Sequence, residues 1–411
     1  MDKHVHSINV GGEILEAEFN NLALRAHGSC IVRQGSTVVL VTAVISKHPR
    51  ADADFLPLTV EYEEKFYAYG KILGSRFMRR EGKPSDEAIL AGRIIDRTIR
   101  PLFDQWIRND IQIVISVLAI GTADPALLAL IGTSLALGTS DIPWNGPVSG
   151  VRVSKKIGAA SYEVNPTFEN RADDEMEFEM IACGKEGIIN MIELGGKEIS
   201  EETALDALGM AAHEIAALQK FQKKIIREHG KPKRVIAEPK TPTKIAALFD
   251  KHIEDSITER IFTNSPGDDA IQELKEEWLS LVAKKIPKVD HSSIATSLFE
   301  RSINEVIHDE AIRNERRSDG RGLNDIRPIF AQAGKVSQML HGSGIFYRGE
   351  THIFSALTLG GPNDTQAWSE SEPQKEKRFM HHYNFPPFST GDTGRIGAPN
   401  RRMIGHGALA E

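Results

Sequence analysis

The sequence has few cysteines and no long apolar run, and each shortage excludes a class of protein. Its 411 residues include only Cys30 and Cys183, too few for a disulfide framework or a cysteine-based zinc site. No apolar run reaches the roughly eighteen residues that suggest a membrane span. The N-terminal segment also lacks the apolar core of a secretory signal peptide. We therefore expect two buried thiols in a cytoplasmic protein that has no membrane partner.

Positive charge is also in short supply. Fifty lysines and arginines stand against 57 aspartates and glutamates, which gives a formal net charge of −7. This balance argues against nonspecific coating of nucleic acid, but it allows a local basic groove, because binding follows the local field. The length predicts about two to four domains.

Common catalytic motifs are missing as well. The chain has no GxxxxGK[ST] phosphate loop, no HExxH or CxxC motif, no GxSxG and no dinucleotide-binding glycine fingerprint after a strand. Scattered carboxylates such as Asp364, Glu370, Glu372 and Asp392 lack the spacing of metal ligands. The residues themselves therefore predict no metal site.

Hydrophobic periodicity divides the chain into segments. The β-branched runs at 38–44 and 111–120 predict buried strands, and the small apolar residues at 125–138 predict a helix packed on both sides. Residues 148–198 are typical of further sheet, with a helix after them. From about 243 to 317 the periodicity is helical throughout, which predicts a small all-helical module.

The most informative pattern is an internal repeat. AHGSCIVRQGSTVVLV at 26–41 returns as LHGSGIFYRGETHIFS at 340–355, with a constant offset of 314. The identical positions are His27, Gly28, Ser29, Ile31, Gly35 and Thr37, which recur as His341, Gly342, Ser343, Ile345, Gly349 and Thr351. Arg79–Arg80 followed by Leu90–Ala91 are echoed by Arg401–Arg402 followed by Leu409–Ala410. A repeat this long predicts a duplicated domain. The second copy is much shorter than the first, so we expect it to be incomplete and the sequence to be a fragment.

Two stretches concentrate arginine. In the first, RFMRREGKPSDEAILAGRIIDRTIRPLF, Ser85 is a plausible N-cap of a helix on which Arg93, Arg97 and Arg100 share one face. Three guanidiniums on one face repel one another unless an anion or carboxylates lie between them. A structural network with the nearby carboxylates is the common outcome in proteins, and an anion site is the alternative.

The second stretch is FPPFSTGDTGRIGAPNRRMIGHGALAE. Its glycines and prolines predict an irregular loop with a Gly-His-Gly turn that leads into an apolar helix. Arg395, Arg401, Arg402 and His406 would project from or beside this loop. A guanidinium fork suits phosphate oxygens, and His406 adds a possible donor. A lone histidine near glycines is more often a structural hydrogen-bonding group, but the neighbouring arginines favour an anion site.

These phrases resemble the bacterial polynucleotide phosphorylases (polyribonucleotide nucleotidyltransferases), which degrade RNA from its 3′ end. The matching phrases are FMRREGKPSDEAILAGRIIDRTIRPLF, LHGSGIFYRGET, HHYNFPPFSTGDTGRIGAP and NRRMIGHGALAE. The resemblance covers essentially the whole chain and implies an α+β fold: a duplicated ribonuclease PH-type domain with an all-helical linker domain between the copies. The implied limits are 1–145 and 146–235 for the two halves of the first copy, 240–318 for the linker and 319–411 for the truncated second copy.

The resemblance also assigns roles to residues. It implies RNA binding by Phe77, Arg79, Arg80, Arg93, Arg97 and Arg100. It places Arg348, Arg401, Arg402 and His406 beside the phosphorolytic centre. Met78 stands where the family commonly has an aromatic residue, so base stacking is expected from Phe77 rather than from Met78. The family's catalytic aspartates and lysine, which carry a divalent metal, lie farther along the second domain, so we expect no catalytic residue in this chain.

The implied reaction is an in-line attack of inorganic phosphate on the 3′-terminal phosphodiester, which reversibly releases a nucleoside diphosphate. Such a reaction needs alignment and charge neutralisation, here by arginines and Mg²⁺. The implied partners are single-stranded RNA, phosphate, nucleoside diphosphates, two further copies in a homotrimer and proteins of an RNA-degradation complex. Members of the family also carry KH and S1 domains. The alternatives are a non-catalytic RNA-binding or scaffold paralogue, and arginine clusters that serve only folding and subunit contact.

Overall fold

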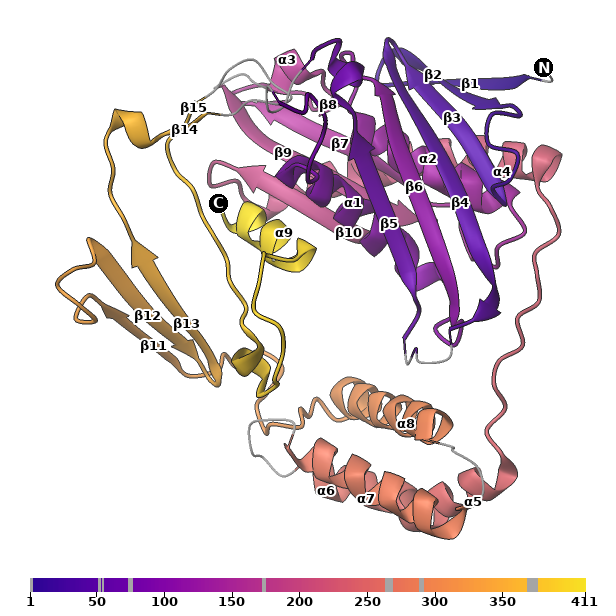
Figure 1. The fold of residues 1–411 in the computed structure, drawn as a ribbon, viewed down its shortest axis with the longest axis vertical. Helices are drawn as coiled ribbons and strands as arrows, with labels where there is room; N and C mark the ends of the chain where they lie inside the picture. Colours follow the sequence, from indigo (N-terminus) through magenta and orange to yellow (C-terminus); the bar gives the residue numbers. More distant parts are fainter. Residues whose placement is uncertain are drawn as a thin grey trace. The chain divides into compact units, whose positions relative to one another are not determined.

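The structure, a computed structural model, describes residues 3–50, 53, 55–72, 77–171, 175–262, 269–287, 292–367 and 376–411. The chain forms two compact units (Figure 1). The first unit is Met1–Ala237 together with Thr365–Glu411, and the second is Glu238–Asp364. Each unit has its own hydrophobic core. This grouping reflects packing, and the domain limits given above stay predictions.

The first unit is built on a six-stranded sheet with the order β1-β2-β3-β4-β6-β5. Its strands are β1 (His4–Val10), β2 (Glu13–Phe19), β3 (Gly28–Gln34), β4 (Thr37–Pro49), β5 (Leu58–Glu64) and β6 (Asn109–Ala119). Neighbouring strands are antiparallel except β5, which pairs in parallel with β6. The two β-branched runs lie in β4 and β6, as predicted, and side chains such as Val41 and Ile113 are fully buried.

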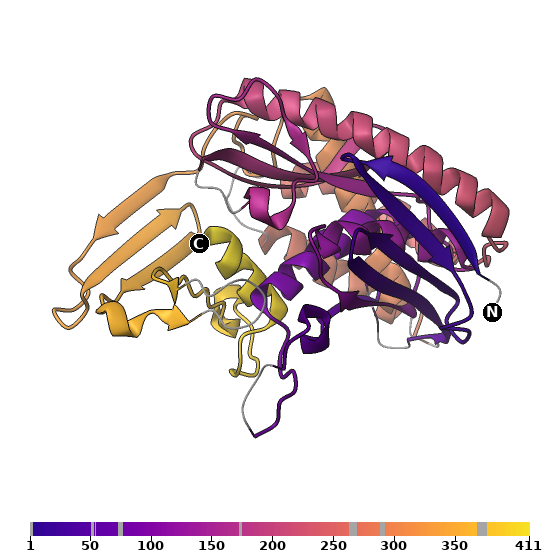
Figure 2. The same cartoon turned by 90° about the horizontal axis from the view of Figure 1, so that it is seen from above.

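A four-stranded sheet in the order β10-β9-β7-β8 completes the core of this unit. Its strands are β7 (Ser149–Lys156), β8 (Glu163–Val164), β9 (Met176–Lys185) and β10 (Ile188–Gly196). Helices α1 (Asp86–Ile99) and α2 (Pro125–Thr139) contact both sheets, and α4 (Glu201–His229) packs along β7 and β9 (Figure 2). Helix α2 is buried on almost every side, as its small apolar sequence predicts.

Both cysteines lie in this core, as predicted. Burial raises the pKa of the Cys183 thiol to about 12. The shorter elements of the first unit are η1 (Phe66–Tyr69), η2 (Arg100–Leu102), α3 (Phe168–Arg171), β14 (Gln366–Ala367), β15 (Glu376–Lys377), η5 (Pro387–Thr390) and α9 (Arg401–Ala410).

The second unit joins a helical module to a three-stranded sheet. Its helices are α5 (Thr243–His252), η3 (Glu254–Ser256), α6 (Ile257–Ile261), α7 (Asp269–Lys285), α8 (Ser292–Arg313) and η4 (Pro362–Asp364). Trp278 lies in the core of this module against Phe249, and its indole N–H donates to the Ala295 carbonyl at 2.9 Å. The sheet has the order β11 (Ile329–Ala333), β12 (Gly342–Arg348), β13 (Thr351–Leu357). Among the described residues of both units, no helix is long and apolar enough to cross a membrane.

The sequence repeat is a repeat of strand pairing. Strands β3 and β4 pair from Gly28↔Ala43 to Gln34↔Thr37. Strands β12 and β13 pair from Gly342↔Leu357 to Arg348↔Thr351, which is the same register shifted by 314 residues. The preceding strands β2 and β11 also pair in corresponding registers with β3 and β12. The predicted duplication is therefore confirmed at the level of individual residue pairs.

The repeated residues are those that the hairpin needs. His27 Nδ1 accepts from the Ile45 amide at 3.3 Å, and its counterpart His341 accepts from the Leu359 amide at 2.8 Å. The turn glycines Gly35 and Gly349 have φ values of +56° and +58°, a left-handed conformation that favours glycine.

The second echo, between the two arginine pairs, is not matched in the structure. Arg79 and Arg80 lie in a loop before the N-cap Ser85 of α1, whereas Arg401 and Arg402 are the first residues of α9. The Gly82-Lys83-Pro84 segment separates the first pair from its helix, while Asn400 caps α9 directly before the second pair.

Candidate functional site

Helix α1 holds the first arginine cluster. Ser85 caps the helix as predicted, and its hydroxyl accepts from the Ala88 amide at 3.1 Å. The apolar face of α1 is buried, so its polar positions are turned away from the core. Arg93 is half-buried and Arg97 is exposed.

Helix α9 begins earlier than the sequence predicts. Asn400 caps it by accepting from the Met403 amide at 3.0 Å, and the helix includes Gly405, His406 and Gly407. The predicted Gly-His-Gly turn is therefore wrong. Both glycines instead permit close packing, since a Cβ on Gly405 would lie 2.5 Å from Arg93 Cδ, and one on Gly407 would lie 3.2 Å from the carbonyl oxygen of His381.

A pocket of about 220 Å³ lies where β5, α1 and α9 meet. Its lining residues are Leu58, Thr59, Val60, Tyr62, Pro84, Ala88, Ile89, Gly92, Arg93, Asp96, Arg97 and Arg401. Three guanidiniums and one carboxylate therefore line a small pocket, which gives it an excess of positive charge. The structure brings Arg93 and Arg97 together with Arg401, although they belong to the two separate stretches singled out in the sequence.

Two of the three arginines of this pocket, Arg401 and Arg93, differ in the hydrogen bonds that they make. Arg401 donates to the Val60 carbonyl at 3.1 Å and forms an ion pair with Glu61. Arg93 Nε is buried and has no hydrogen-bond partner among the described residues. A buried donor without an acceptor costs about 1–3 kcal/mol, and Arg93 Nε is covered by Gly405 of α9, where an added Cβ would lie 2.7 Å from it.

Arg100 has a different environment. Its guanidinium binds Asp96 at 2.9 and 2.7 Å and also donates to the carbonyls of Leu56 and Leu58 at 3.2 and 3.0 Å. These bonds join α1 to the start of β5. The structural network that the sequence left open is formed by Arg100, and a contact of Arg100 with RNA stays a prediction.

Glu193 of β10 is a neighbour of this cluster that sequence reasoning missed. Its Oε1 atom is buried and has no hydrogen-bond partner within the described part of the chain. Burial raises the pKa of the Glu193 carboxyl, and attraction to Arg152, Arg93 and Arg97 opposes this rise. No motif signals it, because it belongs to an ordinary strand distant in sequence from α1.

The loop before α1 presents Phe77, Met78, Arg79 and Arg80. The Phe77 and Met78 side chains are 84% and 70% exposed, and Arg79 has a left-handed φ of +47°. At the base of the loop, the Glu81 carboxylate accepts from the Phe66 amide at 2.8 Å, and this bond is the main cause of its lowered pKa. A loop that Glu81 binds to Phe66 and that exposes the Phe77 ring is suited to stacking on a nucleobase.

The remaining predicted residues lie elsewhere. The Arg402 guanidinium lies 4.8 Å from the centre of the Phe385 ring, and the His406 ring meets Tyr383 edge-on at 4.3 Å. Arg402 and His406 are exposed on α9. Arg348 is exposed at the end of β12 and belongs to the second unit.

Mg²⁺, which the resemblance implies, does not fit the arginine-lined pocket. Mg²⁺ prefers about six oxygen ligands in octahedral geometry. The pocket contains a single carboxylate, Asp96, and this is bound to Arg100.

The sequence model of the 3′ exoribonuclease family, domain 1 (ribonuclease PH), matches residues 14–143 and 325–411. The chain belongs to this family. The two matched segments contain the two copies of the repeated hairpin, so the family match and the strand registers agree that the domain is duplicated.

Known relatives extend well beyond the length of this chain. Polyribonucleotide nucleotidyltransferases of Roseiflexus sp. (strain RS-1), Shouchella clausii and Staphylococcus aureus are 39%, 41% and 40% identical over the whole chain. The chain spans 55%, 57% and 59% of these relatives. A crystal structure of rice Rrp46 has a TM-score of 0.42 to this chain at 12% identity, and the match covers 55% of this chain and 94% of Rrp46.

Proposed function

We propose that the chain is part of a 3′–5′ phosphorolytic exoribonuclease, which uses inorganic phosphate to release nucleoside diphosphates from single-stranded RNA. The observation that carries the proposal is the pocket beside α1 and α9, which is lined by the guanidiniums of Arg93, Arg97 and Arg401. Family membership supports the same reading, and so do the relatives named polyribonucleotide nucleotidyltransferase.

In this proposal the pocket binds phosphate oxygens. An oxygen of inorganic phosphate attacks the phosphorus of the 3′-terminal phosphodiester, a new P–O–P linkage forms, and the bond to the O3′ of the preceding nucleotide breaks. The leaving O3′ takes a proton and becomes the new 3′ end. Arg93, Arg97 and Arg401 align the anions and offset the charge on their oxygens, which is the main requirement of such a step.

The loop before α1 would hold the RNA strand farther from its 3′ end. Phe77 offers a ring face to a base, and Arg79 and Arg80 follow the phosphates. The family resemblance also supports further parts of the proposal. These are the use of Mg²⁺, assembly into a homotrimer, partner proteins of an RNA-degradation complex, a role in mRNA turnover and a cytoplasmic location.

Arg97→Gln tests the pocket, because Arg97 is an exposed lining residue whose replacement leaves the core intact. Arg227→Gln is the matched control, since it removes the same charge from an exposed position on α4. Binding of fluorescent oligoadenylate is measured by anisotropy over a range of salt, with and without inorganic phosphate. We expect Arg97→Gln to weaken binding and to lower the salt slope by about 0.7, the value for one lost phosphate contact on a single strand. Equal RNA affinity and equal salt slope in the two variants would show that the pocket does not bind phosphate.

A non-catalytic RNA-binding or scaffold protein is the competing function. The full-length product of the gene separates the two in a phosphorolysis assay on poly(A). The enzyme releases ADP only when phosphate is present, whereas a scaffold binds the polymer and releases none.

A further inference from the structure

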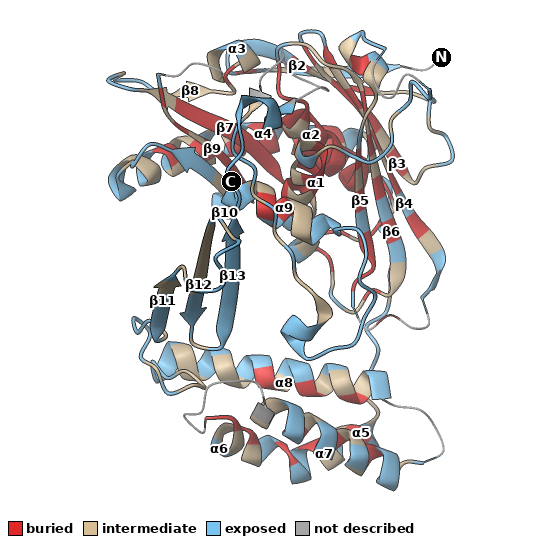
Figure 3. Ribbon diagram, turned by 60° about the vertical axis from the view of Figure 1, so that its left-hand side comes forward, coloured by how far each residue is buried: buried red, intermediate tan, exposed pale blue. Residues whose placement is uncertain are grey.

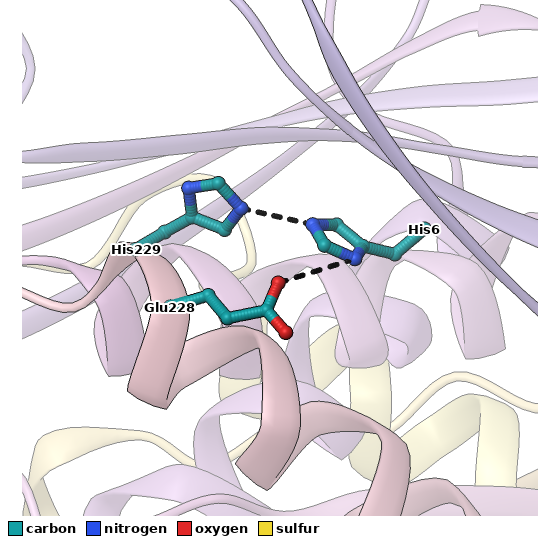
Figure 4. A group of neighbouring side chains, drawn as sticks. All are labelled: His6, Glu228 and His229. Atoms are coloured by element: carbon teal, nitrogen blue, oxygen red, sulfur yellow. Dashed lines mark hydrogen bonds and ion pairs between the residues drawn. The ribbon is translucent and has the colours of Figure 1, made fainter.

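A cluster of histidines lies where β1 meets the end of α4, and it shares no residue with the arginine-lined pocket. Along β1 the side chains alternate, so His4 and His6 project from the same face of the strand. Glu228 and His229 are the last two residues of α4, directly before Gly230. The sheet and the helix thus bring together residues from opposite ends of the first domain copy (Figure 4).

The side chains of this cluster converge on a small volume. His6 Nε2 and His229 Nε2 are 2.9 Å apart, and Glu228 Oε2 lies 3.8 Å from His6 Nδ1. One ligand atom from each of the three residues can be chosen so that all three lie within 4.8 Å of one another. In Figure 4 dashed lines join one oxygen of the exposed Glu228 carboxylate to His6, and His6 to His229.

We propose that His6, Glu228 and His229 bind a divalent transition-metal ion of the Zn²⁺ type. Two imidazoles and one carboxylate are a ligand set that suits zinc, and they leave a fourth position of a tetrahedral ion open. The two imidazoles coordinate through Nε2, and Glu228 coordinates through a carboxylate oxygen.

The arrangement of the two imidazoles is close to that of a metal-bound pair. Two nitrogens each about 2.0 Å from a tetrahedral ion lie about 3.3 Å apart, so the 2.9 Å hydrogen bond must open by a few tenths of an ångström. Two imidazoles on one such ion have ring centroids about 5 Å apart, and the centroids of His6 and His229 are 5.0 Å apart. The rings therefore need only a small rotation to accept an ion.

The surroundings favour binding. The Phe19 ring stacks on His229 with a centroid distance of 5.2 Å and an interplanar angle of 17°, which restricts the orientation of the imidazole. The His4 ring centroid is 5.1 Å from that of His229, which makes His4 the nearest imidazole for the fourth position.

A bound ion would fasten β1 to α4. Strand β1 is an edge strand of the six-stranded sheet and pairs only with β2 among the described residues. Edge strands fray easily, and an ion that binds only the folded chain adds stability in proportion to the logarithm of its concentration above its Kd.

Calorimetric titration of the chain with Zn²⁺, after treatment with a chelator and without a histidine tag, tests the proposal. We expect one equivalent of Zn²⁺ to bind and the Tm to rise with Zn²⁺ but not with Mg²⁺. His6→Gln and His229→Gln should each lower the Zn²⁺ affinity by at least about tenfold. His213→Gln is the matched control, because His213 is an exposed residue of the same helix beside a glutamate, and it should leave the affinity unchanged.

Protection of the unsubstituted chain from a histidine-modifying reagent gives a second readout that needs no variant. Zn²⁺ should slow modification of His6 and His229, as read by mass spectrometry, and should leave the exposed His48 and His213 unaffected. Absence of saturable Zn²⁺ binding, or equal protection of all four histidines, would overturn the site.

Discussion

Gly405 and Gly209 both lie inside helices, but an added methyl group would meet opposite surroundings at the two positions. At Gly209 of α4 an added Cβ would have no neighbour within 4 Å. At Gly405 of α9 it would lie 2.5 Å from Arg93 Cδ and 2.7 Å from Arg93 Nε. One residue type therefore serves two purposes, and only the structure separates them.

We expect Gly209→Ala to raise the free energy of unfolding by about 0.5–1 kcal/mol, because alanine loses less backbone entropy in a helix than glycine does. Gly405→Ala has the same intrinsic benefit, but it must displace Arg93 and should show little or no gain. Urea denaturation measures both variants. Equal stabilisation by the two substitutions would contradict the close contact between α9 and Arg93.

Local spacing explains which site residues could be predicted. The cap at Ser85 and the shared face of Arg93 and Arg97 follow from residues a few positions apart. The carbonyls of Leu58 and Leu56, which also accept from Arg100, are 42 and 44 residues away, and the two histidines of the proposed metal site are 223 residues apart. Such pairs are formed by the tertiary fold, and no short motif carries them.

At the scale of elements, Asp124 joins α2 to the second sheet. It caps α2 by accepting from the Ala126 amide, and it binds the guanidinium of Arg152 on β7 at 2.5 and 3.1 Å. Arg152 also binds Glu179 of β9 at 3.0 Å. Burial by itself would raise the pKa of Asp124, but Arg152 and Arg171 outweigh it and hold the pKa below its usual value.

Arg152→Met should destabilise the first unit by about 3–5 kcal/mol at pH 7, because it leaves buried Asp124 without its main partner. A depressed carboxyl pKa contributes stability that is fully present above the unfolded value, about 4, and is lost as the pH falls through the folded value. The unsubstituted chain should therefore lose more stability between pH 5 and pH 3 than Arg152→Met does.

Urea denaturation at several pH values measures this difference. Lys223→Met, which breaks the exposed pair of Lys223 with Glu186, is the control and should change stability little at any pH. The ion pair would have no such role if the parent chain and Arg152→Met lost stability in parallel on acidification.

Strand β13 differs from its counterpart β4 in what covers it (Figure 3). Ile353 and Phe354 are 48% and 58% exposed, whereas Val39, the equivalent of Ile353, is fully buried. Strand β4 is paired on both sides, while β13 has β12 as its one partner within the described residues. A long apolar edge of this kind favours pairing with another chain.

We expect the 411-residue chain to self-associate through this sheet. Phe354→Lys should shift the population toward monomer in sedimentation velocity, since it removes apolar surface and places a charge on the edge strand. Ser355→Lys adds the same charge to the same strand without removing an aromatic ring, and it should have a smaller effect. If neither substitution changed the sedimentation profile, the chains would associate through another surface.

At the scale of the whole molecule, the duplication is the part of the fold that the sequence predicts best. The sequence shows the offset of 314 because each hairpin requires a glycine at its turn and a histidine that accepts a backbone hydrogen bond. The strand order β4-β6-β5 could not be predicted. Strand β5 follows β4 in the chain but lies at the edge of the sheet, and β6 lies between them, parallel to β5. Periodicity indicates which residues form strands, but pairing partners depend on packing across the whole sheet.

The proposed activity depends on more than the arginines of the pocket. Phosphoryl transfer needs charge neutralisation at the attacked phosphate, and enzymes commonly combine guanidiniums with a metal ion for this purpose. Among the residues that the structure describes, Asp96 is the only carboxylate that lines the pocket, and its oxygens accept hydrogen bonds from Arg100. We therefore expect the pocket to bind an anion without supplying the rest of the reaction.

We accordingly expect the 411-residue chain to bind single-stranded RNA in a manner that phosphate weakens, but to release no nucleoside diphosphate. The measurement is chromatography of the products formed from poly(A) with phosphate and Mg²⁺ present, beside a mock preparation from cells that lack the gene. The polyribonucleotide nucleotidyltransferase of Staphylococcus aureus serves as the positive control. Phosphate-dependent release of ADP by the 411-residue chain, above the mock preparation and lost in Arg97→Gln, would show instead that the described residues suffice for catalysis.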